Sequence, residues 1–261
     1  MKQNRHIICL HGFLGLGSDW NTVLPENINA WKQDLFSPDS THQAGGHASE
    51  TTPPLSDFYS LSNWLNALAQ QTSSTSKNPN HTRNVILGYS LGGRIALATL
   101  AQKPEIWSGA IIVSAHPGLT STKERELRIQ SDEKWATLFE TSEWNSLLSK
   151  WNSQPVLKNT ADPNTDRLEK DFSRQRLASS LRSLSLGRQK DFRCDIQSLK
   201  IPVLWIVGEN DRKFLDLATE VCSLNSGISL VILPNAGHRA PWDQPVKFKK
   251  AVSKFLTGQI P

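Results

Sequence analysis

Residues 85–94 read VILGYSLGGR, an apolar run that leads directly into the pattern Gly-x-Ser-x-Gly. The apolar run predicts a buried strand, and the residues after Ser90 predict a helix. Glycine at positions 88 and 92 lets the chain reverse so tightly that a side chain there would collide with its neighbours. The serine of such a turn takes strained backbone angles that expose its Oγ at the start of the helix. Ser90 is therefore the candidate catalytic serine.

The pattern alone occurs by chance in about one chain in ten of this length. The surrounding sequence must therefore show whether Ser90 is catalytic. Near the N-terminus, the apolar run at 7–10 is followed by His11, Gly12 and Phe13. In enzymes with this turn, a loop after an early strand donates one backbone amide to an oxyanion hole, and the residue after the serine donates the other. We therefore expect the amides of Phe13 and Leu91 to form this hole, with His11 orienting the loop.

Two further strand ends carry the residues that a catalytic serine requires. Residues 201–207 (IPVLWIV) predict a buried strand, and Asp211 follows them in the sequence GEND. Residues 230–233 (LVIL) predict another strand, which leads to His238 in the sequence NAGH. The chain order Ser90, Asp211, His238 is that of the α/β-hydrolase fold and differs from the orders of chymotrypsin and subtilisin. These positions predict a Ser-His-Asp triad.

The order of the predicted elements indicates an α/β protein. Strands and helices alternate, which is typical of a parallel sheet with helices on both faces. From Thr120 to Gln189 the pattern changes to charged helices that contain tryptophan and show no strand signal. We predict an α/β-hydrolase fold with a mostly parallel central sheet. Residues 1–119 and 190–261 form its core, and residues 120–189 form an inserted helical cap.

The composition favours a small anionic substrate. The chain has 29 Lys and Arg against 24 Asp and Glu, so its formal charge is +5, and the excess is spread along the sequence. Such a charge attracts anions. The sequence shows neither a basic stripe with interleaved aromatic residues nor the spacing of a metal site. We expect no nucleic-acid partner and no metal, and the oligomeric state stays open.

The sequence also favours a cytoplasmic location. The three cysteines, Cys9, Cys194 and Cys222, form no Cys-x-x-Cys pair and are expected to be free thiols. The first residues lead into a predicted core strand without a signal-type apolar run, and no later segment is long enough to span a bilayer. We expect no membrane insertion.

The predicted cap is rich in arginine and aromatic side chains, among them Arg128, Trp151 and Arg182. A solvated surface explains most charged helices. A cap that covers an active site would instead turn some guanidinium groups inward, where they bind carboxylates through paired hydrogen bonds. Arg94 lies one helical turn after Ser90, so we expect this arginine above all to face the pocket.

Six segments carry a more specific pattern: LHGFLG-x-G-x-DW at 10–20, GYSLGGR at 88–94, HPGL at 116–119, QPV at 154–156, GE-x-D-x-KF at 208–214 and AGH at 236–238. Together they resemble the 2-succinyl-6-hydroxy-2,4-cyclohexadiene-1-carboxylate (SHCHC) synthase family. The resemblance implies an enzyme that eliminates pyruvate from the anionic precursor SEPHCHC in menaquinone or phylloquinone biosynthesis, without a cofactor. The triad would then abstract a proton and would not form an acyl-enzyme.

The resemblance assigns roles residue by residue. It assigns catalysis to Ser90, Asp211 and His238. It assigns substrate binding to Tyr89, Arg94, Arg128, Trp151 and Arg182. The chain departs from the pattern in two places. Residues 37–49 replace the Asp-Leu-Pro-Gly-His-Gly-x-Ser segment of many relatives of this fold, and Thr120 stands where some family members have Gln.

Two other functions stay open from the sequence. Ser90 could attack a carbonyl and form a covalent intermediate, as in hydrolases of carboxylic esters or carbon–carbon bonds. The chain could also be a noncatalytic ligand-binding relative, although the complete triad argues against this function.

Overall fold

The computed structural model describes residues 5–38, 53–74, 83–158, 160–161, 167–258 and 260. Their central feature is a six-stranded sheet in the order β2-β1-β3-β4-β5-β6, in which every neighbouring pair is parallel. The strands are β1 (Arg5–Leu10), β2 (Ala30–Gln33), β3 (Arg83–Tyr89), β4 (Gly109–Val113), β5 (Val203–Gly208) and β6 (Ile228–Leu233). The predicted α/β class is therefore confirmed.

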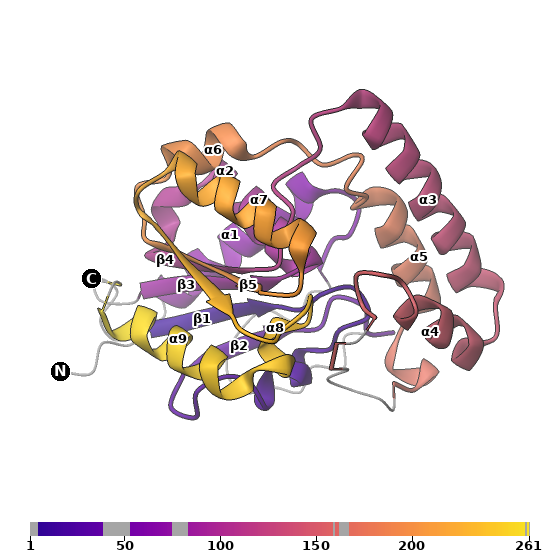
Figure 1. Cartoon of the computed structure of the whole chain (residues 1–261), viewed down its shortest axis with the longest axis horizontal. Helices are drawn as coiled ribbons and strands as arrows, with labels where there is room; N and C mark the ends of the chain where they lie inside the picture. Colours follow the sequence, from indigo (N-terminus) through magenta and orange to yellow (C-terminus); the bar gives the residue numbers. More distant parts are fainter. Residues whose placement is uncertain are drawn as a thin grey trace.

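Helices cover both faces of this sheet (Figure 1). The α-helices are α1 (Phe58–Ser74), α2 (Leu91–Gln102), α3 (Thr122–Thr141), α4 (Trp144–Asn152), α5 (Arg174–Ser183), α6 (Arg193–Ser198), α7 (Arg212–Leu224), α8 (Ala240–Asp243) and α9 (Pro245–Gly258). Shorter 3₁₀ turns are η1 (Gly17–Asn21), η3 (Pro104–Ile106) and η4 (Glu169–Asp171). In Figure 1, α1, α2 and α7 lie on one side of the sheet and α9 lies on the other.

The central strands β4 and β5 are apolar on both faces, as strands buried between two helical layers require. Every residue of β4 and β5 is buried. Side chains alternate between two cores, so that Ile86 packs with α1 and α2 while Leu87 packs with α9. Continuous apolar runs in the sequence therefore correspond to central strands.

Helices α3, α4 and α5 stand together at one end of the sheet in Figure 1. The described residues between β4 and β5 form helices and turns but no strand. Arg176 on α5 joins this region to the rest of the molecule, since its Nη2 donates to the carbonyls of Leu35 at 2.9 Å and Pro53 at 3.0 Å. Most of the rebuilt loop at 37–49 lies outside the described residues.

The turn between β3 and α2 leaves no room for side chains at its glycines. A Cβ atom at Gly88 would meet the carbonyl oxygen of Gly92, and one at Gly92 would meet the carbonyl oxygen of Leu10. Between these glycines, Ser90 has φ 52° and ψ −108°. The backbone is therefore strained at the serine, as the sequence pattern predicts.

Among the described residues, no helix is both long and apolar enough to cross a membrane. All three cysteines are unpaired, and Cys9 is buried.

Gly92→Ala should destabilise the fold, because its methyl group would collide with rigid backbone of β1 and not with a movable side chain. Overpacking of this kind costs about 1–3 kcal/mol or more. Urea unfolding followed by circular dichroism would measure the change. The matched control is Gly258→Ala at the end of α9, where a Cβ meets no atom within 4 Å and stability should be kept or slightly raised. Equal midpoints for the two variants would contradict the packing argument.

Candidate active site

Three strand ends bring Ser90, His238 and Asp211 together. His238 Nδ1 lies 2.7 Å from Asp211 Oδ2, and His238 Nε2 lies 3.1 Å from Ser90 Oγ. An ionised carboxylate only accepts hydrogen bonds, so Nδ1 carries the proton and Nε2 accepts from the serine hydroxyl. His238 and Asp211 are 4% and 7% exposed, so water competes little for these bonds. The arrangement can pass a proton from Ser90 to His238.

The ring of His238 is held by aromatic neighbours. Phe214, from α7, packs on it with ring centroids 4.5 Å apart, and Tyr89 lies 5.6 Å away. Tyr89 also packs edge-on against Trp242 of α8 at 5.0 Å. Tyr89, which the resemblance assigns to substrate binding, therefore lines the pocket and also packs beside His238.

The candidate oxyanion amides lie at the same end of the sheet. Leu91 is the first residue of α2, a position at which a helix leaves its amide without an intrahelical partner. Phe13 follows β1, and its amide donates to no carbonyl in the described part of the chain. His11 steadies this loop, because its Nδ1 donates to the Gly12 carbonyl at 2.7 Å and its Nε2 accepts from the Leu35 amide at 3.0 Å. This geometry suits the orienting role expected of His11.

A pocket of about 510 Å³ opens above Ser90 and His238, within the usual size range of small-molecule sites. One wall is aromatic: the Trp151 ring lies 4.6 Å from that of Phe13 and 4.9 Å from that of Trp135. Trp151 comes from α4 and Trp135 from α3, so the predicted cap supplies much of this wall.

The pocket carries an excess of positive charge. Among the described residues, five cationic side chains line it: Arg94, Arg128, Arg167, Lys213 and Arg239. Only two carboxylates, Asp19 and Asp132, do so. A concave, partly dry surface with this imbalance concentrates anions, since low-dielectric walls strengthen the field of each charge.

Arg94 is the cation best placed for an anion. Its Nη1 donates to two neutral acceptors, the Leu184 carbonyl at 3.0 Å and Gln189 Oε1 at 3.1 Å, and no described carboxylate pairs with it. Gln189 is fully buried. Burial, followed by the charge of Arg128, lowers the pKa of Arg94 to about 9, so the side chain stays charged at neutral pH but poorly solvated. A bound carboxylate would supply the missing counter-ion.

Arg128 also lines the pocket but brings its own counter-ion. Its Nε lies 2.8 and 2.9 Å from the two oxygens of Asp132, one helical turn along α3. Asp132 is almost fully buried, whereas the Arg128 side chain is 40% exposed. The terminal nitrogens of Arg128 bond to no described residue, so Asp132 holds the guanidinium while leaving these donors available.

Sequence reasoning missed Arg167. Its Nη2 pairs with Asp19 Oδ2 at 2.9 Å, and both side chains are more than nine-tenths buried. Arg167 Nη1 and Asp19 Oδ1 are buried without a partner in the described part of the chain. Asp19 belongs to the N-terminal motif, but nothing in the local sequence of Arg167 signals a contact with a residue 148 positions away.

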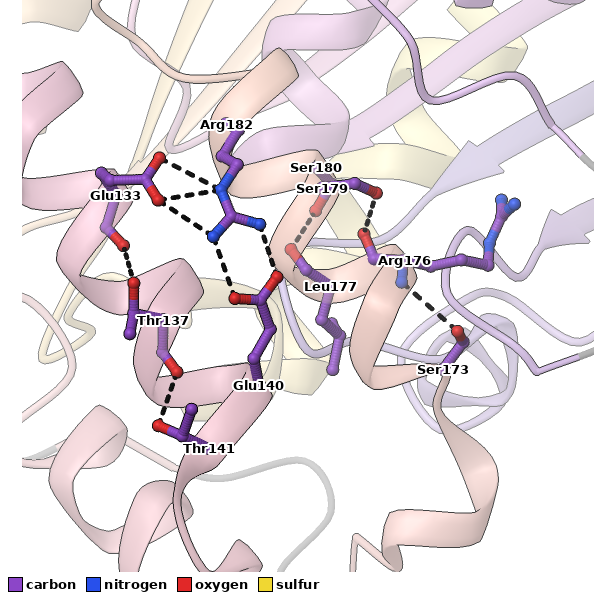
Figure 2. Close-up of polar contacts among 10 residues, drawn as sticks. All are labelled: Glu133, Thr137, Glu140, Thr141, Ser173, Arg176, Leu177, Ser179, Ser180 and Arg182. Atoms are coloured by element: carbon purple, nitrogen blue, oxygen red, sulfur yellow. Dashed lines mark hydrogen bonds and ion pairs between the residues drawn. The ribbon is translucent and has the colours of Figure 1, made fainter.

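The structure does not bring Arg182, which the resemblance assigns to substrate binding, to the pocket above Ser90. Figure 2 shows its guanidinium between Glu133 and Glu140 of α3. Its Nε lies 3.0 Å from Glu133 Oε1, and its Nη2 lies 3.0 Å from Glu140 Oε2. Arg182 therefore joins α5 to α3 on the outer surface, because the α5 face that carries it points away from the cavity. Thr120 is exposed and does not line the pocket either.

Comparison with known proteins agrees with this geometry. Residues 7–251 match the family described as the alpha/beta hydrolase family. The SHCHC synthase of Pectobacterium atrosepticum is 30% identical, with 97% of this chain and 94% of that protein covered. The enzyme of the same name from Photorhabdus laumondii is 32% identical, with 96% and 85% covered.

A solved structure shows the same fold. The structure of MenH from S. aureus superposes with a TM-score of 0.81 at 19% identity and covers 99% of this chain and 96% of its own. The chain thus belongs to the alpha/beta hydrolase family and, within it, to the SHCHC synthase family.

Proposed function

We propose that this protein is an SHCHC synthase, a lyase that eliminates pyruvate from SEPHCHC in menaquinone or phylloquinone biosynthesis. One observation carries the proposal: a complete, hydrogen-bonded triad opens onto a pocket with an excess of positive charge. Simple ester hydrolysis needs no such charge, whereas a substrate with several carboxylates does. The names of the relatives point to the same reaction.

The proposed chemistry uses Ser90 as a base. His238, oriented by Asp211, accepts the hydroxyl proton, and the serine oxygen removes the ring proton α to the ketone of the succinyl group. The amides of Phe13 and Leu91 stabilise the negative charge that develops. A new ring double bond then forms as the bond between ring carbon and enol oxygen breaks, and the departing enolpyruvate takes up the proton held by His238 and is released as pyruvate. Asp211 stabilises the imidazolium during these steps.

Side chains that line the pocket bind the substrate. Arg94 and Arg128 bind carboxylates of the substrate, and Trp151 and Tyr89 pack against its ring. Each charge-assisted hydrogen bond contributes about 1.5–3 kcal/mol. We further propose that residues 120–189 act as the cap of this site, because α3 and α4 supply Arg128 and Trp151. Arg167, which lines the same pocket, is a further candidate.

The proposed partners are limited to the small anionic substrate. Neither a nucleic acid nor a resident cofactor has a part in the proposed reaction. We propose a cytoplasmic location, for which the three unpaired cysteines are the support, since free thiols persist in reducing compartments.

The direct test is to incubate the purified protein with freshly generated SEPHCHC. Pyruvate should appear orders of magnitude faster than in the spontaneous reaction, because the triad and the arginines act together on one substrate. Mass spectrometry of rapidly quenched enzyme should show no substrate-derived adduct on Ser90. An acyl-serine that accumulates during turnover would instead support the ester or carbon–carbon bond hydrolase.

Ser90→Ala, Asp211→Asn and His238→Ala should each reduce pyruvate release by orders of magnitude with the fold intact. The three residues form one proton-transfer unit, so a double variant should be hardly slower than the slower single variant. Steady-state kinetics and thermal unfolding would measure both effects. Near-normal turnover by His238→Ala would refute the triad assignment.

Arg94→Ala should lower kcat/KM at least about tenfold, or about 1.4 kcal/mol, because a substrate carboxylate would lose a poorly solvated partner. Arg182→Ala is the matched control: its ion pairs lie at the surface, where such pairs contribute about 1 kcal/mol or less to stability. Its kcat/KM should stay within about twofold of the wild type. Similar kinetics for the two variants would remove the main support for a polyanionic substrate.

A further inference from the structure

Gln189 contacts Arg94 from outside the cavity. Its side chain is fully buried and is not among the described residues that line the pocket above Ser90, whereas Arg94 lines it. Its backbone is fixed as well, because Nη1 of Arg125 on α3 donates to the Gln189 carbonyl at 2.6 Å. The reaction described above assigns Gln189 no part. A ligand in the pocket meets this residue only through its neighbours.

The side-chain amide of Gln189 lies between a donor and an acceptor. Arg94 Nη1 donates to its Oε1 at 3.1 Å, and its Nε2 donates to the His116 carbonyl at 3.0 Å. A guanidinium only donates and a carbonyl only accepts, so the amide makes both bonds in one orientation alone. An ionised carboxylate of the same size could accept from Arg94 but could not donate to His116. Glutamine therefore suits both neighbours at once.

Neutral groups hold the guanidinium of Arg94 in place. Nη1 also donates to the Leu184 carbonyl at 3.0 Å, and Cζ lies 5.5 Å from the centroid of the Phe58 ring of α1. In the described part of the chain, Gln189 is the one side chain that accepts a hydrogen bond from Arg94. Nε and Nη2 of Arg94 bond to no described residue. Arg94 is thus oriented by one nitrogen and keeps its charge and its other donors.

The titratable residues in contact with this amide or its backbone are Arg94 on α2, Arg125 on α3 and His116 after β4. Arg128 and Asp132, both on α3, act on the charge of Arg94. Burial, followed by the positive charges around it, lowers the pKa of His116 to about 3, so its ring is uncharged at neutral pH. A carboxylate in place of the amide would therefore be attracted chiefly by the two arginines and would neutralise Arg94.

We propose that Gln189 is a positioning residue that makes the pocket selective for carboxylates, because its amide orients Arg94 without neutralising it. The proposal rests on the proposed function, which gives Arg94 a substrate carboxylate to bind. Arg182 shows the opposite arrangement, since Glu133 and Glu140 hold it with carboxylates and leave little charge for a further anion. The difference between an amide and a carboxylate as the acceptor thus decides whether an arginine can bind a ligand.

Gln189→Glu tests the proposal, because pH sets the charge of the new side chain. The protonated carboxyl group accepts from Arg94 and donates to the His116 carbonyl, as glutamine does. The ionised group pairs with Arg94 and donates to nothing. From about pH 5.5 to about pH 8, KM for SEPHCHC should therefore rise at least about tenfold relative to the wild type at the same pH. The value of kcat should change much less, because the lost interaction is with a carboxylate that does not react.

Gln130→Glu is the matched control. It makes the same substitution at an exposed position of α3 that does not line the pocket. Water and salt screen this charge, so KM should stay within about twofold of the wild type at both pH values. Wild-type KM for Gln189→Glu at about pH 8, or equal effects of the two substitutions, would overturn the proposal.

Gln189→Met covers a glutamate variant that fails to fold. Methionine is of similar length but has no donor and only a weak acceptor, so Arg94 keeps its charge and loses its side-chain partner. KM should rise at every pH, without the pH step. This rise should be absent when Arg94 is already alanine, because Gln189 acts through Arg94. Additive effects in the double variant would contradict the positioning role.

Phthalate, a six-membered ring with two carboxylates, gives a readout that needs no turnover. In calorimetric titrations, Gln189→Glu should bind phthalate at least about tenfold more weakly than the wild type at about pH 8 and about equally at pH 5.5. Equal Kd values at the higher pH, or no binding to either protein, would overturn the proposal. A protein that shows this difference but releases no pyruvate from SEPHCHC would refute the proposed function alone.

Discussion

Direct backbone contact between β1, β3 and α2 is the constraint on which the site depends. No Cβ atom fits at Gly88 or Gly92, because the carbonyls of Gly92 and Leu10 occupy that space. Between these glycines, Ser90 has a positive φ of 52°. The same contact places the serine hydroxyl, the first amide of α2 and the loop after β1 at one end of the sheet. Strain at one residue is thus maintained by the packing around it.

The partners of each arginine decide its role. Arg94 is held by a carbonyl and an amide oxygen, so its charge is left for a ligand. Arg128 shares its charge with Asp132 at one nitrogen only. Arg182 is surrounded by two glutamates and serves to join helices. Arginines on neighbouring helices therefore have different roles, because a guanidinium already neutralised by carboxylates attracts a further anion only weakly.

The triad by itself does not decide the reaction, since the same three groups can attack a carbonyl or remove a proton. The pocket above it decides, through the charge and shape that it offers the substrate. Here Trp151, Trp135 and Phe13 line the same pocket as the five cationic side chains. Such a pocket selects a ring that carries carboxylates and disfavours an apolar ester.

The sequence by itself determined the parallel sheet, the strained turn at Ser90 and the order of the triad residues. These features are local, because each depends on a few adjacent residues at the end of an apolar strand. The carboxyl ends of parallel strands then lie at the same edge of the sheet. The same locality applies to Arg94, whose direction follows from its place one turn after the serine.

Only the tertiary structure decided which other side chains face the pocket. Arg182 looked equivalent to Arg128 in the sequence, but its direction depends on Glu140, 42 residues away. The pairing of Arg167 with Asp19 and the bond from Gln189 to His116 likewise join distant segments. Helical periodicity shows that a helix has two faces, but which face meets the cavity depends on the packing of α3 against α5. That packing depends on the whole folded chain and cannot be predicted from any single segment of the sequence.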